Sequence, residues 1–187
     1  MIFARHFLPA LFLTVLATAS IAAPARAPAP LTLDPYVGDW RGTATATSET
    51  DEDFPTTKRD IAVSLAKTNL SGFLLSWSTL QRQKGSPAAP LEVMKSTTVE
   101  FVPAPTPNQW RAKADADVYR GEILYWARLD GSGLVVSSFT INPDGKPEFQ
   151  TYRRRIVGKE MKLDFSNVKD GKFVRTVQGS LRKLKSR

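Results

Sequence analysis

The second half of the chain alternates short strand-like runs with tight-turn signals, and this spacing constrains the fold most strongly. Each turn signal contains a Gly that can take the positive φ of a tight hairpin; the signals lie at 130–133, 142–145, 158–159 and 169–171. The runs between them are rich in Val, Ile, Thr, Phe, Tyr and Trp, and no stretch sustains a helical period of 3.6 residues. The pattern predicts an all-β fold with neighbouring strands joined by short turns.

Strand patterns continue through the first half, with longer connections between them. The predicted strands are 38–48, 59–67, 71–82, 92–103, 108–115, 121–130, 133–142, 147–157, 160–167 and 172–184. Met161, Leu163 and Phe165 alternate with polar residues, which is typical of a strand with one buried face. About ten strands without an obvious second sheet favour a closed antiparallel up-and-down barrel, because closure removes unpaired edges. A two-sheet sandwich is the alternative.

The N-terminal residues have the pattern of an export signal. Arg5 and His6 precede a short apolar run, and small residues follow up to Ala23, so 1–23 is predicted to be a signal peptide. The Ala/Pro-rich stretch 24–32 is predicted to be a disordered tether, and 33–187 a single domain. No later run is long and apolar enough to predict a transmembrane segment. The mature chain is therefore expected to be soluble and either periplasmic or secreted.

Two residue types that dominate catalysis and metal binding are missing from the predicted mature chain. The sole histidine, His6, lies in the signal peptide, and the chain has no cysteine. Histidine bases, thiol nucleophiles and most zinc or iron sites are excluded on this ground. The acidic residues 49–53 lack the spacing of a calcium loop and are interpreted as a solvated segment. We expect no metal, no cofactor and no enzymatic activity.

Positive charge is concentrated at the C-terminal end. Residues 146–187 hold 13 Lys and Arg against 4 Asp and Glu, whereas 24–145 hold 12 against 14. A basic surface of this kind favours an acidic partner, such as an envelope surface, and export makes nucleic acid an unsuitable one. The alternative is that these side chains simply face water along exposed strands and keep the protein soluble.

Two short motifs resemble the lipocalin-like (calycin) β-barrel superfamily. Gly38-Asp39-Trp40 opens the first predicted strand, and Arg182 lies in the last. The resemblance implies that Trp40 closes one end of the barrel and that Arg182 stacks on it through a cation–π contact. It also implies an internal site for a small ligand. Haem binding, as in the nitrobindin-like branch, conflicts with the missing histidine.

The resemblance raises the question whether the barrel is hollow. If Trp40 points inward, strand periodicity places Gly42, Ala44 and Ala46 on the same face, and such small side chains leave volume for a cavity. The alternative is an interior filled by large side chains from other strands: Phe73, Leu75, Trp77, Phe139, Leu163 and Phe165. Trp77 is then either a core residue or part of the cavity wall.

The strand 147–157 supplies the candidate ligand-binding residues. Tyr152 and Arg154 share the face that carries one arginine, which favours this face as the interior. A buried Arg154 needs a charge partner, either a ligand carboxylate or a protein carboxylate; otherwise it faces water. Arg175 is a second candidate, but it has the opposite strand parity to Arg182, and a bulge at Gly179 would reconcile the two.

These observations predict an exported binding or carrier protein for a small apolar or amphipathic ligand, anionic ligands included. The candidate ligand-binding residues are Arg154, Tyr152, Arg175 and Trp77, and the candidate closure residues are Trp40 and Arg182. The alternative is a non-enzymatic envelope protein whose basic outer surface binds an acidic partner.

Overall fold

The computed structural model describes residues 31–50, 56–69, 71–82 and 92–185. The predicted signal peptide, most of the predicted tether and the acidic residues 51–53 lie outside these ranges. None of the helices within them is long and apolar enough to cross a membrane. The elements are η1 (Asp34–Tyr36), β1 (Gly38–Ser48), β2 (Thr56–Lys67), β3 (Phe73–Arg82), β4 (Glu92–Pro103), β5 (Gln109–Ala112), η2 (Val118–Arg120), β6 (Leu124–Asp130), β7 (Gly133–Ile141), β8 (Pro147–Val157), β9 (Glu160–Lys169) and β10 (Lys172–Lys183).

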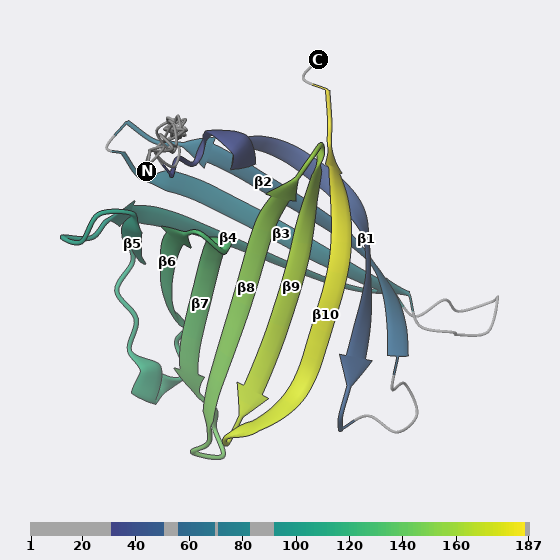
Figure 1. The fold of residues 1–187 in the computed structure, drawn as a ribbon. Coiled ribbons are helices and arrows are strands. Elements are labelled where there is room, and N and C mark those ends of the chain that lie inside the picture. The colour runs from purple at the N-terminus through teal and green to yellow at the C-terminus, as the bar shows by residue number, and fades with distance from the viewer. Residues whose placement is uncertain (1–30, 51–55, 70, 83–91, 186–187) are drawn as a thin grey trace, which may run out of the picture. The chain divides into compact units, whose positions relative to one another are not determined.

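The ten strands form one closed antiparallel barrel. Each strand pairs with the next along the chain, and β1 also pairs with β10, so that the first and last strands lie side by side (Figure 1). Trp40 at the start of β1 is opposite Val63 on β2 and Lys183 on β10. The predicted all-β barrel is confirmed, and the alternative two-sheet sandwich is wrong.

The hairpin turns of the second half follow the predicted turn chemistry. Between β9 and β10, Asp170 and Gly171 both have positive φ angles, 51° and 74°. Two successive positive φ angles are typical of the type I′ hairpin turn, which Asp-Gly favours because glycine has no Cβ penalty there. Strands β7 to β10 accordingly lie within two residues of their predicted bounds.

The connection between β5 and β6 is longer than predicted. The predicted strand 108–115 ends at Ala112, and the next strand begins at Leu124 instead of 121. The turn η2 lies in the connection, where the Asp117 carboxylate accepts a hydrogen bond from the Tyr119 backbone N–H at 3.0 Å. The Asp117 N–H in turn donates to the Glu122 carboxylate at 2.8 Å. These side-chain bonds satisfy backbone groups locally and thereby compete with strand pairing.

Two glycines mark the seam at which the barrel closes. A Cβ on Gly42 of β1 would overlap the backbone carbonyl of Ser180 on β10, and one on Gly179 would lie 2.8 Å from the Ala44 Cβ. A larger residue at either position would force the two strands apart. The close approach of β1 and β10 therefore depends on glycine at both sites.

The end of the barrel that contains Trp40 is closed and filled. Phe73 stacks on Phe101 with ring centroids 4.8 Å apart and meets Trp110 edge-on at 5.4 Å. Leu33, just before η1, and Tyr36, its last residue, are buried in the same cluster, and Trp40 donates its indole N–H to the Tyr36 carbonyl at 2.9 Å. The predicted burial of Trp40 at a closed end is what the structure shows.

Arg182 does not stack on Trp40, which corrects the closure expected from the resemblance. The cation over the Trp40 ring is Lys183 Nζ, 5.6 Å from the centroid. Lys183 is the cross-strand partner of Trp40, whereas Arg182 is opposite Arg41 on the outer face. The register is regular from Arg175 to Arg182, so no bulge occurs at Gly179, and Arg175 shares its face with Lys183.

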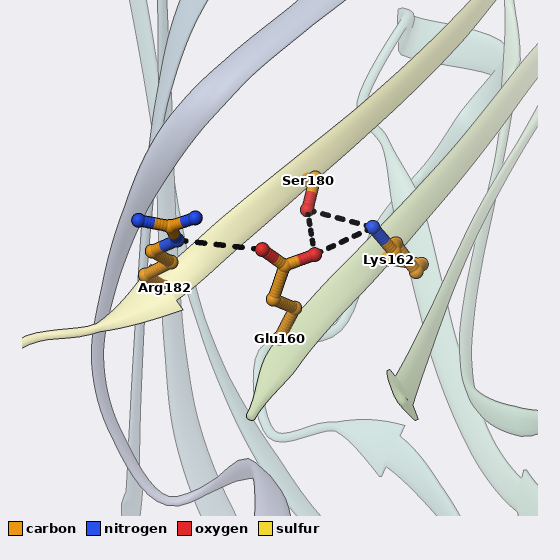
Figure 2. A network of polar contacts seen from close by, with 4 residues as sticks. All are labelled: Glu160, Lys162, Ser180 and Arg182. Atoms are coloured by element: carbon orange, nitrogen blue, oxygen red, sulfur yellow. Dashed lines mark hydrogen bonds and ion pairs between the residues drawn. The ribbon is translucent and has the colours of Figure 1, made fainter. Parts of the chain in front are cut away.

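Arg182 instead belongs to a polar network on the outside of β9 and β10 (Figure 2). Its Nε lies 3.3 Å from the Glu160 carboxylate, which also accepts hydrogen bonds from Ser180 Oγ at 2.8 Å and Lys162 Nζ at 2.6 Å. These three donors hold the pKa of Glu160 at about 2, below its usual value of 4.5. The network joins the two strands near the closed end.

Phe139 was one of the large side chains expected in a filled interior, but it lies on the outer face of β7. It is opposite Phe149, which has the outward parity of β8. The expected alternation on β9 is confirmed, because Met161 and Leu163 are buried and Phe165 packs against the same core.

Candidate functional site

The half of the barrel away from Trp40 encloses a cavity of about 400 Å³. It is lined by inward residues of β2, β3, β4, β8, β9 and β10, together with Ile123 and Tyr125 at the start of β6. This volume lies within the range of about 300–1,000 Å³ that is usual for small-molecule sites. The sequence left open whether the barrel is hollow. In the structure, the interior is filled in one half and hollow in the other.

An aromatic wall runs along the cavity. Trp77 from β3 meets Tyr152 from β8 at 5.2 Å and Tyr125 from β6 at 6.0 Å, measured between ring centroids. Tyr152 in turn packs against Phe165 of β9 at 4.6 Å. Aliphatic side chains of Ile61, Val63, Leu163 and Val177 also line the cavity. The wall suits an apolar or aromatic ligand body.

Arg154 lies at the deep end of this wall and is 1% exposed. Its guanidinium carbon is 5.6 Å from the ring centroids of both Trp77 and Tyr152, close enough for cation–π contacts. Its Nε and Nη1 atoms are buried and have no hydrogen-bond partner in the structure. Burial lowers its pKa to about 10, so the side chain still carries its charge at neutral pH.

The buried Arg154 guanidinium has fewer hydrogen-bond acceptors than it needs. Two cation–π contacts offset only part of the cost of removing a guanidinium from water, and the Nε and Nη1 atoms remain without acceptors. No ion pair to Arg154 occurs among the residues that the structure describes. A carboxylate or similar anion in the cavity would supply the missing acceptors.

Next to Arg154, Tyr152 begins a chain of hydrogen bonds along β8 toward the open end. Its hydroxyl donates to Gln150 Oε1 at 2.8 Å, and Gln150 Nε2 donates to Glu148 at 2.7 Å. Burial raises the pKa of Tyr152 to about 12, so the hydroxyl keeps its proton and remains a donor. The direction of the chain is therefore set by a neutral tyrosine at one end and a carboxylate at the other.

Glu148 is the carboxylate among the residues that line the cavity. Burial alone would raise its pKa, but hydrogen bonds from Gln150, Asn142 and Asn167 lower it below the usual value. Asn142 and Asn167 donate to it at 3.1 and 2.9 Å. Glu148 is thus ionised, and side-chain amides rather than arginines occupy its oxygens.

Three further cations line the cavity nearer the mouth: Arg59, Lys95 and Arg175. The Nε atoms of both Arg59 and Arg175 are buried without a hydrogen-bond partner. Burial lowers the pKa of Arg59, and the charge of Arg175 lowers it further, which places the two guanidinium groups near one another. Among the described lining residues, four cations, Arg154 included, face one carboxylate, which makes this lining strongly electropositive.

The structure brings together all four residues singled out as ligand-binding candidates, since Arg154, Tyr152, Arg175 and Trp77 line the same cavity. Their role toward a ligand stays a prediction. Sequence reasoning missed Arg59, Lys95 and Glu148. Arg59 was within reach, because it shares strand parity with the apolar residues Ile61, Val63 and Leu65 that mark the inner face of β2.

No group of three or more His, Cys, Asp or Glu side chains that could hold a metal ion occurs in the described part of the chain. What the cavity offers chemically is therefore anion pairing, aromatic contact and hydrogen bonding from Tyr, Gln and Asn.

Comparisons with known proteins give a likeness of fold and none of sequence. No protein-family model matches the chain, and no curated protein matches it by sequence. Among solved structures, the S-type phycobiliprotein lyase CPES from Guillardia theta matches with a TM-score of 0.53 and 9% identity over 83% of this chain and 92% of that one. Rv2717c from M. tuberculosis matches with a TM-score of 0.51 and 16% identity over 82% and 95% of the two chains.

A protein of unknown function from the DUF3598 family of Nostoc punctiforme matches with a TM-score of 0.52 and 11% identity over 83% of this chain. This chain spans about half of that protein, 51% of its length. At such low identities the likeness concerns the fold alone. The chain has a lipocalin-like barrel fold, and no sequence match supports membership of that superfamily.

Proposed function

We propose that the protein is an exported binding or carrier protein that holds a small amphipathic molecule inside its barrel, with an anionic group of the ligand paired to Arg154. Export, to the periplasm or the medium, rests on the N-terminal sequence 1–23. Mass spectrometry of the processed chain tests it, with an N-terminus just after Ala22 or Ala23 as the expected result.

The observation that carries the proposal is the unpartnered Arg154 at the end of an aromatic wall. A guanidinium that is 1% exposed and has two buried nitrogen atoms without acceptors is costly to the folded protein. A feature of this kind is typical of a functional site whose partner is supplied from outside. Trp77 and Tyr152 beside the guanidinium supply contact area for the apolar body of the ligand.

The fold does not decide between a binder and an enzyme. One structure of similar fold is named a phycobiliprotein lyase, so the expectation of a protein without enzymatic activity has no support from the comparison. We favour a carrier because the described cavity residues offer cations and hydrogen-bond donors to an anion, and holding a ligand requires no bond-making group. Ligand recovered unchanged after binding is the expected result.

The alternative of a basic outer surface has to take account of local ion pairs. Lys162 and Arg182 contact Glu160, and Arg155 contacts Asp164 at 2.8 Å. Lys146 and Lys169 contact Asp170 and Asp144 at 3.6 and 3.1 Å in the same region. These pairs engage five of the thirteen Lys and Arg of residues 146–187, and for those five side chains solvated strands are a better interpretation than a docking face.

Binding of dodecanoate to the purified mature protein tests the proposal. Isothermal titration calorimetry, together with displacement of the fluorescent probe 1-anilinonaphthalene-8-sulfonate, should show a saturable site. Arg154→Met should weaken it by about 10- to 100-fold, because a charge-assisted hydrogen bond contributes about 1.5–3 kcal/mol.

Arg155→Met is the matched control, because the neighbouring side chain faces outward and pairs with Asp164. It should leave dodecanoate binding unchanged. Equal affinity of the wild type and the Arg154→Met variant, or no binding by either, would contradict the proposed function.

A further inference from the structure

A second group of cations lies nearer the mouth of the cavity, and the proposed function does not use it. Arg59 on β2 is the partner of Ala44, and Arg175 on β10 is the partner of Ser48, so the two arginines flank β1. Between these positions the inward residues of β1 are Ala44 and Ala46, both buried. Side chains no larger than a methyl group therefore separate two guanidinium groups that reach over β1 from either side.

Within the described ranges, these two guanidinium groups have no ion-pair partner. Each has a buried Nε without a hydrogen-bond partner, and neither forms an ion pair with any residue in the described ranges. The nearest chemical candidate in the lining, Glu148, already accepts hydrogen bonds from three side-chain amides. Two like charges near one another in a shielded position repel unless an anion lies between them.

The arginine pair and Arg154 belong to different levels of the barrel. Arg175 is opposite Asn167, which is opposite Gln150, four residues before Arg154 on β8. Four strand residues correspond to about 13 Å along the strand. Between the two positions lie Tyr152 and Phe165 of the aromatic wall.

We infer that the ligand carries two anionic groups at opposite ends of an apolar or aromatic body, one paired with Arg154 and the other shared by Arg59 and Arg175. The inference rests on the proposed function and narrows its ligand class from monoanions to elongated dianions. Lys95, in the same lining, adds attraction for the outer group. A carboxylate, sulfate or phosphate suits that position, because arginine pairs bind such planar or tetrahedral oxyanions through several N–H groups.

Calorimetric titration with α,ω-dicarboxylates and monocarboxylates of matched length, from 8 to 14 carbons, tests the inference directly. At the best chain length the wild type should bind the dicarboxylate at least about tenfold more tightly than the monocarboxylate, since each charge-assisted contact contributes more than the 1.4 kcal/mol of a tenfold change. The double variant R59M/R175M should lose this preference. Arg154→Met should weaken both series.

The matched control is R41M/R182M. Arg41 and Arg182 also lie opposite each other on β1 and β10, but they face outward. This control should keep the full preference for the dicarboxylate, and circular dichroism should show all variants folded. A wild type without the preference, or R59M/R175M with it intact, would overturn the second anion position while leaving the proposed function standing. If neither series bound, the proposed function would fail and the inference with it.

Discussion

The two halves of the barrel interior differ in what fills them, although the same strands build both. Around Trp40, aromatic and aliphatic side chains close the space, and Phe73, Phe101 and Leu181 have no exposed surface. In the other half, charged and amide side chains surround about 400 Å³ of open volume. The first half is organised for stability, whereas the second holds groups that a stable apo-protein would avoid. Changes in the two halves should therefore have opposite consequences.

The largest effect is expected from Phe73→Ala in the closed half. Its ring stacks on Phe101 and contacts Trp110, so truncation leaves a cavity that the surrounding rings cannot fill. The free energy of unfolding should fall by about 3–5 kcal/mol. Chemical denaturation followed by circular dichroism measures it. A loss below 1 kcal/mol would show that this half is not the stabilising core.

Arg154→Met should shift stability in the other direction. The substitution keeps an unbranched side chain of similar reach and removes a cation that has two buried nitrogen atoms without partners. After the loss of its cation–π contacts, the free energy of unfolding of the apo-protein should still rise by about 1–3 kcal/mol. The same denaturation experiment measures it, and Arg155→Met, on the outer face, should stay within about 0.5 kcal/mol of wild type.

A gain in stability together with a loss of ligand binding would be the signature of a functional site that is maintained at the expense of the fold. If Arg154→Met were destabilising by more than 1 kcal/mol, the arginine would instead have a structural partner, and the contrast between the two halves would disappear.

A smaller effect on the free energy of unfolding is expected at Trp40, where the neighbouring Arg182 provides a control for Lys183. Lys183 Nζ lies over the indole, whereas Arg182 faces outward toward Glu160. Lys183→Ala should lower the free energy of unfolding by about 0.5–1 kcal/mol, because an exposed cation on an aromatic ring contributes that much. Arg182→Ala should cost less, within about 0.5 kcal/mol, since exposed ion pairs contribute little. If Arg182→Ala were the more destabilising variant in thermal or chemical denaturation, Arg182 and not Lys183 would be the cation that stacks on Trp40.

The architecture was predictable because its signals are local. Turn glycines such as Gly171, and the alternation at Met161, Leu163 and Phe165, depend on neighbours within a few residues. The face of β8 that carries Tyr152 and Arg154 followed from the same alternation. Each of these predictions needs only the two-residue period of a strand.

What could not be predicted depends on register between distant strands. Whether Arg182 or Lys183 covers Trp40 is decided by a one-residue shift in the pairing of β1 with β10, which reverses the face of every side chain. The sequence could not decide whether the barrel contains a cavity, for a similar reason. Arg59 and Arg175 are far apart in sequence, and they become neighbours only because β1 lies between β2 and β10 and contributes Ala44 and Ala46 there.

The smallest predicted effect concerns how the stability of the closed end changes with pH. Its carboxylate, Glu160, is paired with cations, whereas Glu148 in the cavity is bound by side-chain amides. Hydrogen bonds from Lys162, Ser180 and Arg182 hold the Glu160 pKa near 2, below its usual 4.5. A depressed pKa stabilises the folded state above about pH 4.5, and the contribution disappears as the pH falls toward 2. Glu160→Gln should therefore be less stable than wild type at pH 7, and the difference should vanish near pH 2.

Ser180→Ala, which keeps the carboxylate and two of its donors, should show a smaller difference over the same range. Parallel denaturation curves for wild type and Glu160→Gln at every pH would mean that solvent already screens this network.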